Sequence, residues 1–125
     1  MSKSALSVLV FGLYLSILAL GFLIFPNTVL SLFSLPNTNE VWVRVVGMLL
    51  FGLSYYYIQM ARLEFKPFFR FSAQARALVI VFFIVFFLLD LTKVGLLILG
   101  VIDFLAALWT ALALKSESES VFNIL

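Results

Sequence analysis

A single carboxylate interrupts one of the most apolar stretches of the chain. Asp103 lies within GVIDFLAALWT, residues 100–110. A carboxylate at the centre of a bilayer costs about 2.5–3.5 kcal/mol on insertion scales, so it normally faces protein or water and has a partner. At helical spacing Asp103 shares a face with Gly100, Ala107 and Thr110, and small residues on such a face allow another helix to approach. We therefore expect Asp103 to point between helices.

Hydroxyl groups at a similar depth are the expected partners of this carboxylate. Tyr14 is the tenth residue of the apolar run 5–25, as Asp103 is of the run 94–114. We expect the Tyr14 hydroxyl to donate a hydrogen bond to Asp103, as polar groups do between membrane helices. Two further polar residues lie slightly deeper in the run 41–61. The candidate intramembrane polar site thus consists of Asp103, Tyr14, Ser54 and Tyr55.

A second candidate feature is an ion pair at the outer rim of the membrane. Arg44 lies just inside the start of the run 41–61, about 9 Å from the level of Asp103 at 1.5 Å per residue. Glu40 and Asp90 are closer to Arg44 in depth. We expect Arg44 to pair with one of these two carboxylates.

Two interpretations of Asp103 remain open. In the first, Asp103 is a structural clasp that joins helices through hydrogen bonds, which are common between membrane helices. In the second, Asp103 titrates within a proton- or cation-coupled transport site, since intramembrane ionisable residues often mark transport pathways. The pattern favours the clasp, because carriers usually add broken helices or a second ionisable group at the same depth.

The composition excludes several classes of chemistry. Hydrophobic residues make up 65% of the 125 residues and charged residues 11%, against about 25% charged in an average soluble domain. The sequence has no cysteine and no histidine, so disulfides, thiolate or imidazole nucleophiles and histidine-ligated metals are excluded. We expect no metal, no cofactor and no enzymatic activity. The short basic segment 62–76 is flanked by apolar runs, so nucleic acid is not an expected partner.

The element that positions Asp103 is one of four long apolar runs. A membrane-spanning helix needs about 20 such residues. The chain is therefore expected to be an all-α polytopic membrane protein, an antiparallel four-helix transmembrane bundle in a single domain, 1–125. A short interfacial helix is expected between spans one and two, where PNTVLSLFSLPNT is too short to cross a bilayer. The expected spans are residues 5–25, 41–61, 72–91 and 94–114.

The basic residues predict the orientation of these spans. Six of the eight belong to the N-terminus, the 62–76 segment and the C-terminal end; these are Lys3, Arg62, Lys66, Arg70, Arg76 and Lys115. Only Arg44 and Lys93 lie toward the other side. The positive-inside rule then places both termini in the cytoplasm. The first span is longer than a signal-peptide core, so we expect an uncleaved anchor, and we expect 115–125 to be a polar cytoplasmic tail.

Three motifs carry a resemblance to a known group of proteins. They are the proline after span one, the Arg-x-x-Gly at Arg44–Gly47 and the aspartate in IDFLAALWTALAL. With these the chain resembles the DoxX-like group and neighbouring small four-span proteins of the bacterial inner membrane. The resemblance implies a four-helix membrane bundle without an assigned activity, and it transfers no catalytic residue.

The expected function follows from these features. The chain is expected to be an accessory or scaffold protein, or a protein that interacts with lipid. Its expected partners are the bilayer, a lipid ligand, and another membrane protein or a second copy of itself. The alternative is a small proton- or cation-coupled transporter or channel that uses Asp103.

Overall fold

The computed structural model describes the backbone of residues 1–124 and the side chains of residues 1–118. In this part of the chain the structure is all-α, with five helices and no strand. Four of the helices are long and apolar enough to cross a membrane. The helices are α1 (Lys3–Ile24), α2 (Pro26–Leu32), α3 (Trp42–Arg62), α4 (Lys66–Leu88) and α5 (Gly95–Ile124).

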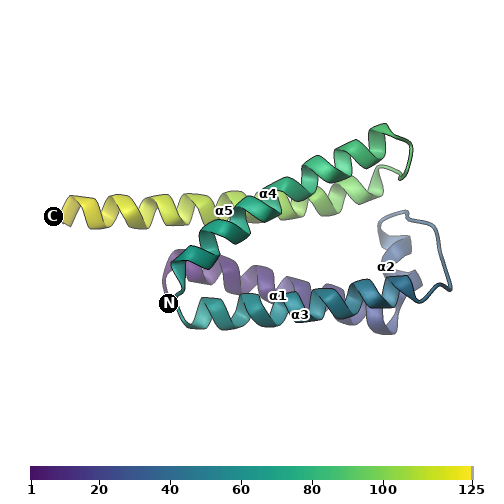
Figure 1. Cartoon of the computed structure of the whole chain (residues 1–125), viewed down its shortest axis with the longest axis horizontal. Coiled ribbons are helices and arrows are strands. Elements are labelled where there is room, and N and C mark those ends of the chain that lie inside the picture. Colours follow the sequence, from purple (N-terminus) through teal and green to yellow (C-terminus); the bar gives the residue numbers. More distant parts are fainter. Residues whose placement is uncertain (125) are drawn as a thin grey trace.

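The long helices associate in two pairs (Figure 1). Helix α1 packs along α3, α4 packs along α5, and α1 also contacts α5, which joins the pairs. Helices α1, α3 and α4 share an apolar core; its buried members are Ala5, Val8, Phe11, Leu15, Tyr57, Ala61 and Phe69. Elsewhere large apolar side chains face outward: Ile17 and Leu88 are each 73% exposed. This pattern is expected of helices whose outer surface is solvated by lipid.

Proline explains two helix boundaries. Pro26 follows the break at Phe25, where φ is −127° and ψ is 60°, and it begins α2. Pro67 lies in the first turn of α4, where a missing N–H costs nothing. Helix α4 consequently begins at Lys66 rather than at residue 72, and most of the segment expected to be a loop is helical. Helix α5 likewise continues through residues 115–124, where a tail was expected.

Three helices end in the same way, on a residue in the left-handed region. Ser34, Glu64 and Asp90 have φ of 55°, 55° and 59° and follow the ends of α2, α3 and α4. The N–H of the next residue then bonds back to a carbonyl in the last helical turn, as Leu91 does to Phe86 at 2.9 Å. Glycine is the usual residue at this position, because it adopts positive φ without a steric cost.

A close approach of backbone fixes the start of α5. A Cβ added to Gly95 would collide with the backbone carbonyl of Phe33, which follows α2. In contrast, a Cβ added to Gly52 in α3 would meet nothing within 4 Å. The α2 segment and the turn before α5 therefore fit together only because residue 95 has no side chain.

Candidate functional site

The most unusual side chain in the structure is a buried arginine inside α4. Arg76 is only 3% exposed. Its Nε donates to the backbone carbonyl of Ser72 at 3.2 Å, and its Nη2 donates to the Ser72 Oγ at 3.2 Å and to the Thr110 Oγ1 at 2.9 Å. The bonds to Ser72 lie within α4, and the bond to Thr110 ties α4 to α5. Because α4 begins at Lys66, Arg76 lies in the middle of a long apolar helix and not at its edge.

Aromatic rings from the other helix pair complete the surroundings of Arg76. Its Cζ lies 4.7 Å from the ring centroid of Phe11 in α1 and 5.6 Å from that of Tyr57 in α3. A guanidinium at such distances is attracted by the ring faces, more strongly where water is excluded. All four long helices therefore contact one cation. We call this set the arginine cluster; it comprises Ser7, Phe11, Tyr57, Ser72, Arg76 and Thr110.

Hydroxyl groups extend the arginine cluster into α1. The Ser7 Oγ and the Thr110 Oγ1 share a hydrogen bond of 2.8 Å, and Ser7 also donates to the Ser4 carbonyl at 2.7 Å. Ser7 and Thr110 are both buried. The cluster thus consists of satisfied hydroxyls around one charge, an arrangement suited to holding helices together.

The structure places Asp103 near Tyr14 without a hydrogen bond between them. The Tyr14 hydroxyl is buried and has no hydrogen-bond partner among the described residues, so the expected bond to Asp103 is not formed. Asp103 is half-buried and lies within electrostatic reach of both Tyr14 and Arg76. Arg76 was expected at the cytoplasmic flank, so its position near this carboxylate was not predicted. The signal that reveals it is Pro67, which marks a helix start before residue 72.

The other two residues of the candidate polar site, Ser54 and Tyr55, lie on different faces of α3. Ser54 is buried and donates to the Phe51 carbonyl at 2.7 Å within its own helix. Tyr55 is 60% exposed. The tyrosine of α3 that reaches the arginine cluster is Tyr57 instead, because it lies one helical turn after Ser54 on the inward face.

The expected ion pair at the outer rim is not present either. The Arg44 guanidinium donates to the backbone carbonyl of Leu23. This carbonyl belongs to the last turn of α1, where carbonyls lack partners within the helix and attract cations. Lys66 makes both of the ion pairs found among the described side chains, so Arg44 is not within 4.0 Å of a Glu40 or Asp90 carboxylate.

Lys66 instead organises a polar network where three parts of the chain meet. Its Nζ contacts Glu117 of α5 and donates to the Ser4 Oγ at 2.9 Å. The Ser4 N–H and Oγ both donate to Glu117, at 2.9 and 2.7 Å. In the turn before Lys66, the Glu64 carboxylate accepts from the Ser2 N–H and Oγ, which lowers the pKa of Glu64. The network fixes the N-terminus to α5 and to the α3–α4 turn.

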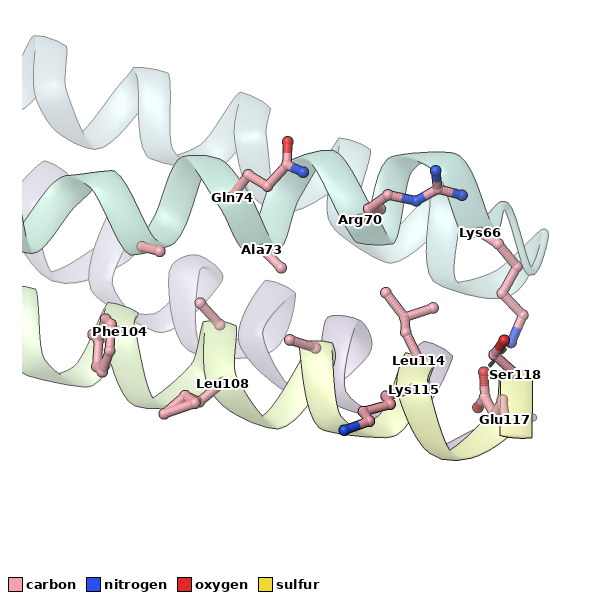
Figure 2. Close-up of a pocket in the computed structure, with 13 residues that line it drawn as sticks. Lys66, Arg70, Ala73, Gln74, Phe104, Leu108, Leu114, Lys115, Glu117 and Ser118 are labelled. Carbon is pink, nitrogen blue, oxygen red and sulfur yellow. Dashed lines mark hydrogen bonds and ion pairs between the residues drawn. The ribbon is translucent and has the colours of Figure 1, made fainter. Parts of the chain in front are cut away.

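A large groove lies between α4 and α5, beside this network (Figure 2). It has a volume of about 1010 Å³. Its middle is lined by small and apolar residues; these are Ala73, Ala77, Phe104, Ala107, Leu108, Ala111 and Leu114. Charged and polar residues gather toward one end, and they include Lys66, Arg70, Lys115 and Glu117. The groove is therefore amphipathic along its length.

The donor set of the described residues does not form a metal site, since no three His, Cys, Asp or Glu residues are grouped there to hold an ion. In the comparisons with known proteins, no family model, no curated protein and no solved structure matches the chain.

Proposed function

We propose that the chain is a multi-pass protein of the bacterial inner membrane, folded as an antiparallel four-helix transmembrane bundle with α2 at the outer interface. Two features support this topology. The network around Lys66 brings the N-terminus, the α3–α4 turn and the Glu117 region of α5 to one end. Without the buried Arg76, five basic residues still lie toward that end and two toward the other. Both termini are then cytoplasmic by the positive-inside rule.

Within this membrane, the function we propose is to bind a lipid-like amphiphile as an accessory or scaffold protein. The observation that carries it is the groove between α4 and α5. Its volume lies at the upper end of the roughly 300–1,000 Å³ typical of ligand sites. It follows α4 from Lys66 to Ala77, about 16 Å at 1.5 Å per residue.

The distribution of polarity in the groove favours an amphiphile over a small polar solute. The alanine-rich part lies on helices that lipid would otherwise surround, and small residues leave a channel where a hydrocarbon chain can pack. The charged end lies beside the network that joins the N-terminus to α5. A molecule with an apolar chain and a polar head can place the chain in the alanine-rich part of the groove and the head at its charged end.

Groove-filling variants test this proposal. The full chain is purified from membranes with a mild detergent, and bound lipid is measured by native mass spectrometry. Ala77→Phe and Ala111→Phe are expected to reduce bound lipid at least about fivefold, because the ring occupies the groove. Ala75→Phe is the matched control, since Ala75 is exposed on α4 and does not line the groove. The wild type without bound lipid, or equal loss in the control, would refute the proposal.

Proton- or cation-coupled transport through Asp103 is the second candidate, and the position of Arg76 favours it. The pair provides two ionisable groups within electrostatic reach of each other, which transport sites often contain. However, α4 and α5 are continuous helices through both residues, whereas transporters commonly interrupt helices at the site. Proton flux into proteoliposomes that Asp103→Asn abolishes, with folding intact, would establish this alternative.

A further inference from the structure

We infer that the groove between α4 and α5 selects phospholipids whose headgroup carries a net negative charge, and that Arg70 and Lys115 hold the headgroup phosphate. The inference rests on the proposed function, because it requires that an amphiphile occupies the groove. It assigns the chemical class of the headgroup and the two residues that recognise it.

The charges among the described residues that line the groove are predominantly positive. The lining includes three cations, Lys66, Arg70 and Lys115, and one carboxylate, Glu117, all toward the same end. Lys66 reaches Glu117, whereas Arg70 and Lys115 extend from opposite helices. A headgroup at this end therefore enters a positive potential. Basic pockets between transmembrane helices near the membrane surface bind anionic headgroups for this reason.

The cations differ in whether they are already neutralised. Lys66 contacts Glu117 and lies 3.8 Å from the Glu64 carboxylate, and it also donates to Ser2 and Ser4. The positive charge of Lys66 is therefore neutralised by carboxylates of the protein itself. Arg70 and Lys115 are both exposed, and neither has a carboxylate within 4.0 Å among the side chains of residues 1–118. Among the described side chains, these are the two groove-lining cations that have no ion pair.

Arg70 and Lys115 lie toward the end of the groove where the headgroup of a bound lipid would lie. Arg70 lies one turn further into α4 than Lys66, and Ala73 and Ala77 continue the same wall of the groove. Arg70 offers the planar fork that binds phosphate oxygens in pairs, and Lys115 contributes a point charge from the opposite helix. A zwitterionic headgroup would bring its own cation close to these two. Repulsion between the cations opposes that arrangement.

A direct comparison of two lipids with identical acyl chains tests the inference. The full chain in detergent micelles is titrated with phosphatidylglycerol or phosphatidylcholine, and retention is measured by native mass spectrometry. We expect about a tenfold preference for phosphatidylglycerol, consistent with two basic residues near a headgroup. Arg70→Gln with Lys115→Gln should abolish the preference and leave phosphatidylcholine retention unchanged. The matched control is Lys3→Gln with Arg62→Gln, which removes two exposed cations outside the groove.

The outcomes separate the inference from the proposed function. Equal retention of both lipids by the wild type, or a preference that survives the Arg70 and Lys115 substitutions, overturns the inference alone. Loss of all lipid retention in the wild type, or retention insensitive to Ala77→Phe, overturns the proposed function as well. Inorganic phosphate at millimolar concentration should not displace phosphatidylglycerol, and displacement would show that the groove recognises free phosphate instead of a lipid.

Discussion

At the scale of single residues, Arg76 combines a high cost of desolvation with contacts that offset only part of it. Removing a guanidinium from water costs several kcal/mol even after relaxation. Here two hydroxyl groups, one backbone carbonyl and two aromatic rings replace the lost hydration. Nη1 has no hydrogen-bond partner among the described residues, so the compensation is incomplete. Each contact that Arg76 does make is therefore important for stability.

Thr110→Val tests this balance with almost no change in volume. The substitution removes one of the two acceptors of Arg76 Nη2, leaving the Ser72 Oγ, and it removes the hydroxyl partner of Ser7. We expect the free energy of unfolding to fall by about 1–3 kcal/mol, the cost of a buried donor left unsatisfied. Thermal unfolding in detergent followed by circular dichroism measures it. Thr28→Val is the control, because Thr28 is exposed and should change little; a Thr110 variant as stable as wild type would show that Arg76 finds another acceptor.

A second prediction concerns Glu64 and pH. Two hydrogen bonds from Ser2 hold the pKa of Glu64 below its ordinary value in the folded state. A lowered folded pKa contributes stability above the unfolded pKa, and this contribution is lost as pH falls through the folded pKa. We expect acid to destabilise the wild type more than Glu64→Gln between pH 6 and pH 3, roughly the window of carboxyl titration. Identical acid profiles for Glu64→Gln and wild type would contradict the assignment.

The helical face of Asp103 could be predicted from the sequence, but its surroundings could not. The face that includes Gly100, Ala107 and Thr110 could be predicted, because helical periodicity alone places these residues together, and all three are buried. The contact between Arg76 and Thr110 could not, since it depends on where α4 begins and on how α4 crosses α5. The Tyr14 bond was wrong because equal depth in two helices does not make two side chains meet.

At the scale of elements, hydropathy predicted four long helices and the structure contains four that could span a membrane. Their ends were harder to predict. The basic and aromatic segment 62–71 has the composition of a loop, yet Pro67 in a first helical turn is compatible with helix from Lys66 onward. The structure reduces the connection between α3 and α4 to Leu63–Phe65.

Gly95→Ala is the sharpest test of how these elements fit. The added methyl group would overlap the Phe33 carbonyl, so either α5 or the α2 segment must shift. We expect a loss of stability of about 1–3 kcal/mol, typical of overpacking. Gly52→Ala is the control: it meets nothing within 4 Å, and better helix propensity should stabilise α3 by up to about 1 kcal/mol. Similar effects of the two substitutions, measured by thermal unfolding, would refute the close approach.

At the scale of the whole molecule, charge placement and the polar network both support the proposed topology. The positive-inside argument depends on composition alone. The network depends on contacts between Ser2, Ser4, Lys66 and Glu117, which no sequence pattern predicts because each partner is far away along the chain. Moving Arg76 from the flank to the interior weakens the charge bias without reversing it.

Reporter fusions test this topology in cells. A reporter active only in the cytoplasm should be active when fused after residue 125, and a periplasmic reporter should be active when inserted at Asn37 in the first outer loop. The physical reason is that five basic residues resist translocation against two. Periplasmic activity after residue 125, or activity of both reporters at one site, would contradict the proposed orientation.

The three left-handed residues at helix ends have a practical consequence for work on this protein. Glu64 is needed there, since its carboxylate binds Ser2. Ser34 and Asp90 make no described side-chain hydrogen bond, so their side chains only impose backbone strain. Asp90→Gly should relieve about 1–2 kcal/mol of strain and lose about 0.5–1 kcal/mol to the entropy of the unfolded chain. The net gain raises the melting temperature, while Asp90→Ala retains the strain and gains nothing. Such a variant would tolerate longer purification and leave the lipid-binding measurements untouched, because residue 90 lies outside the groove.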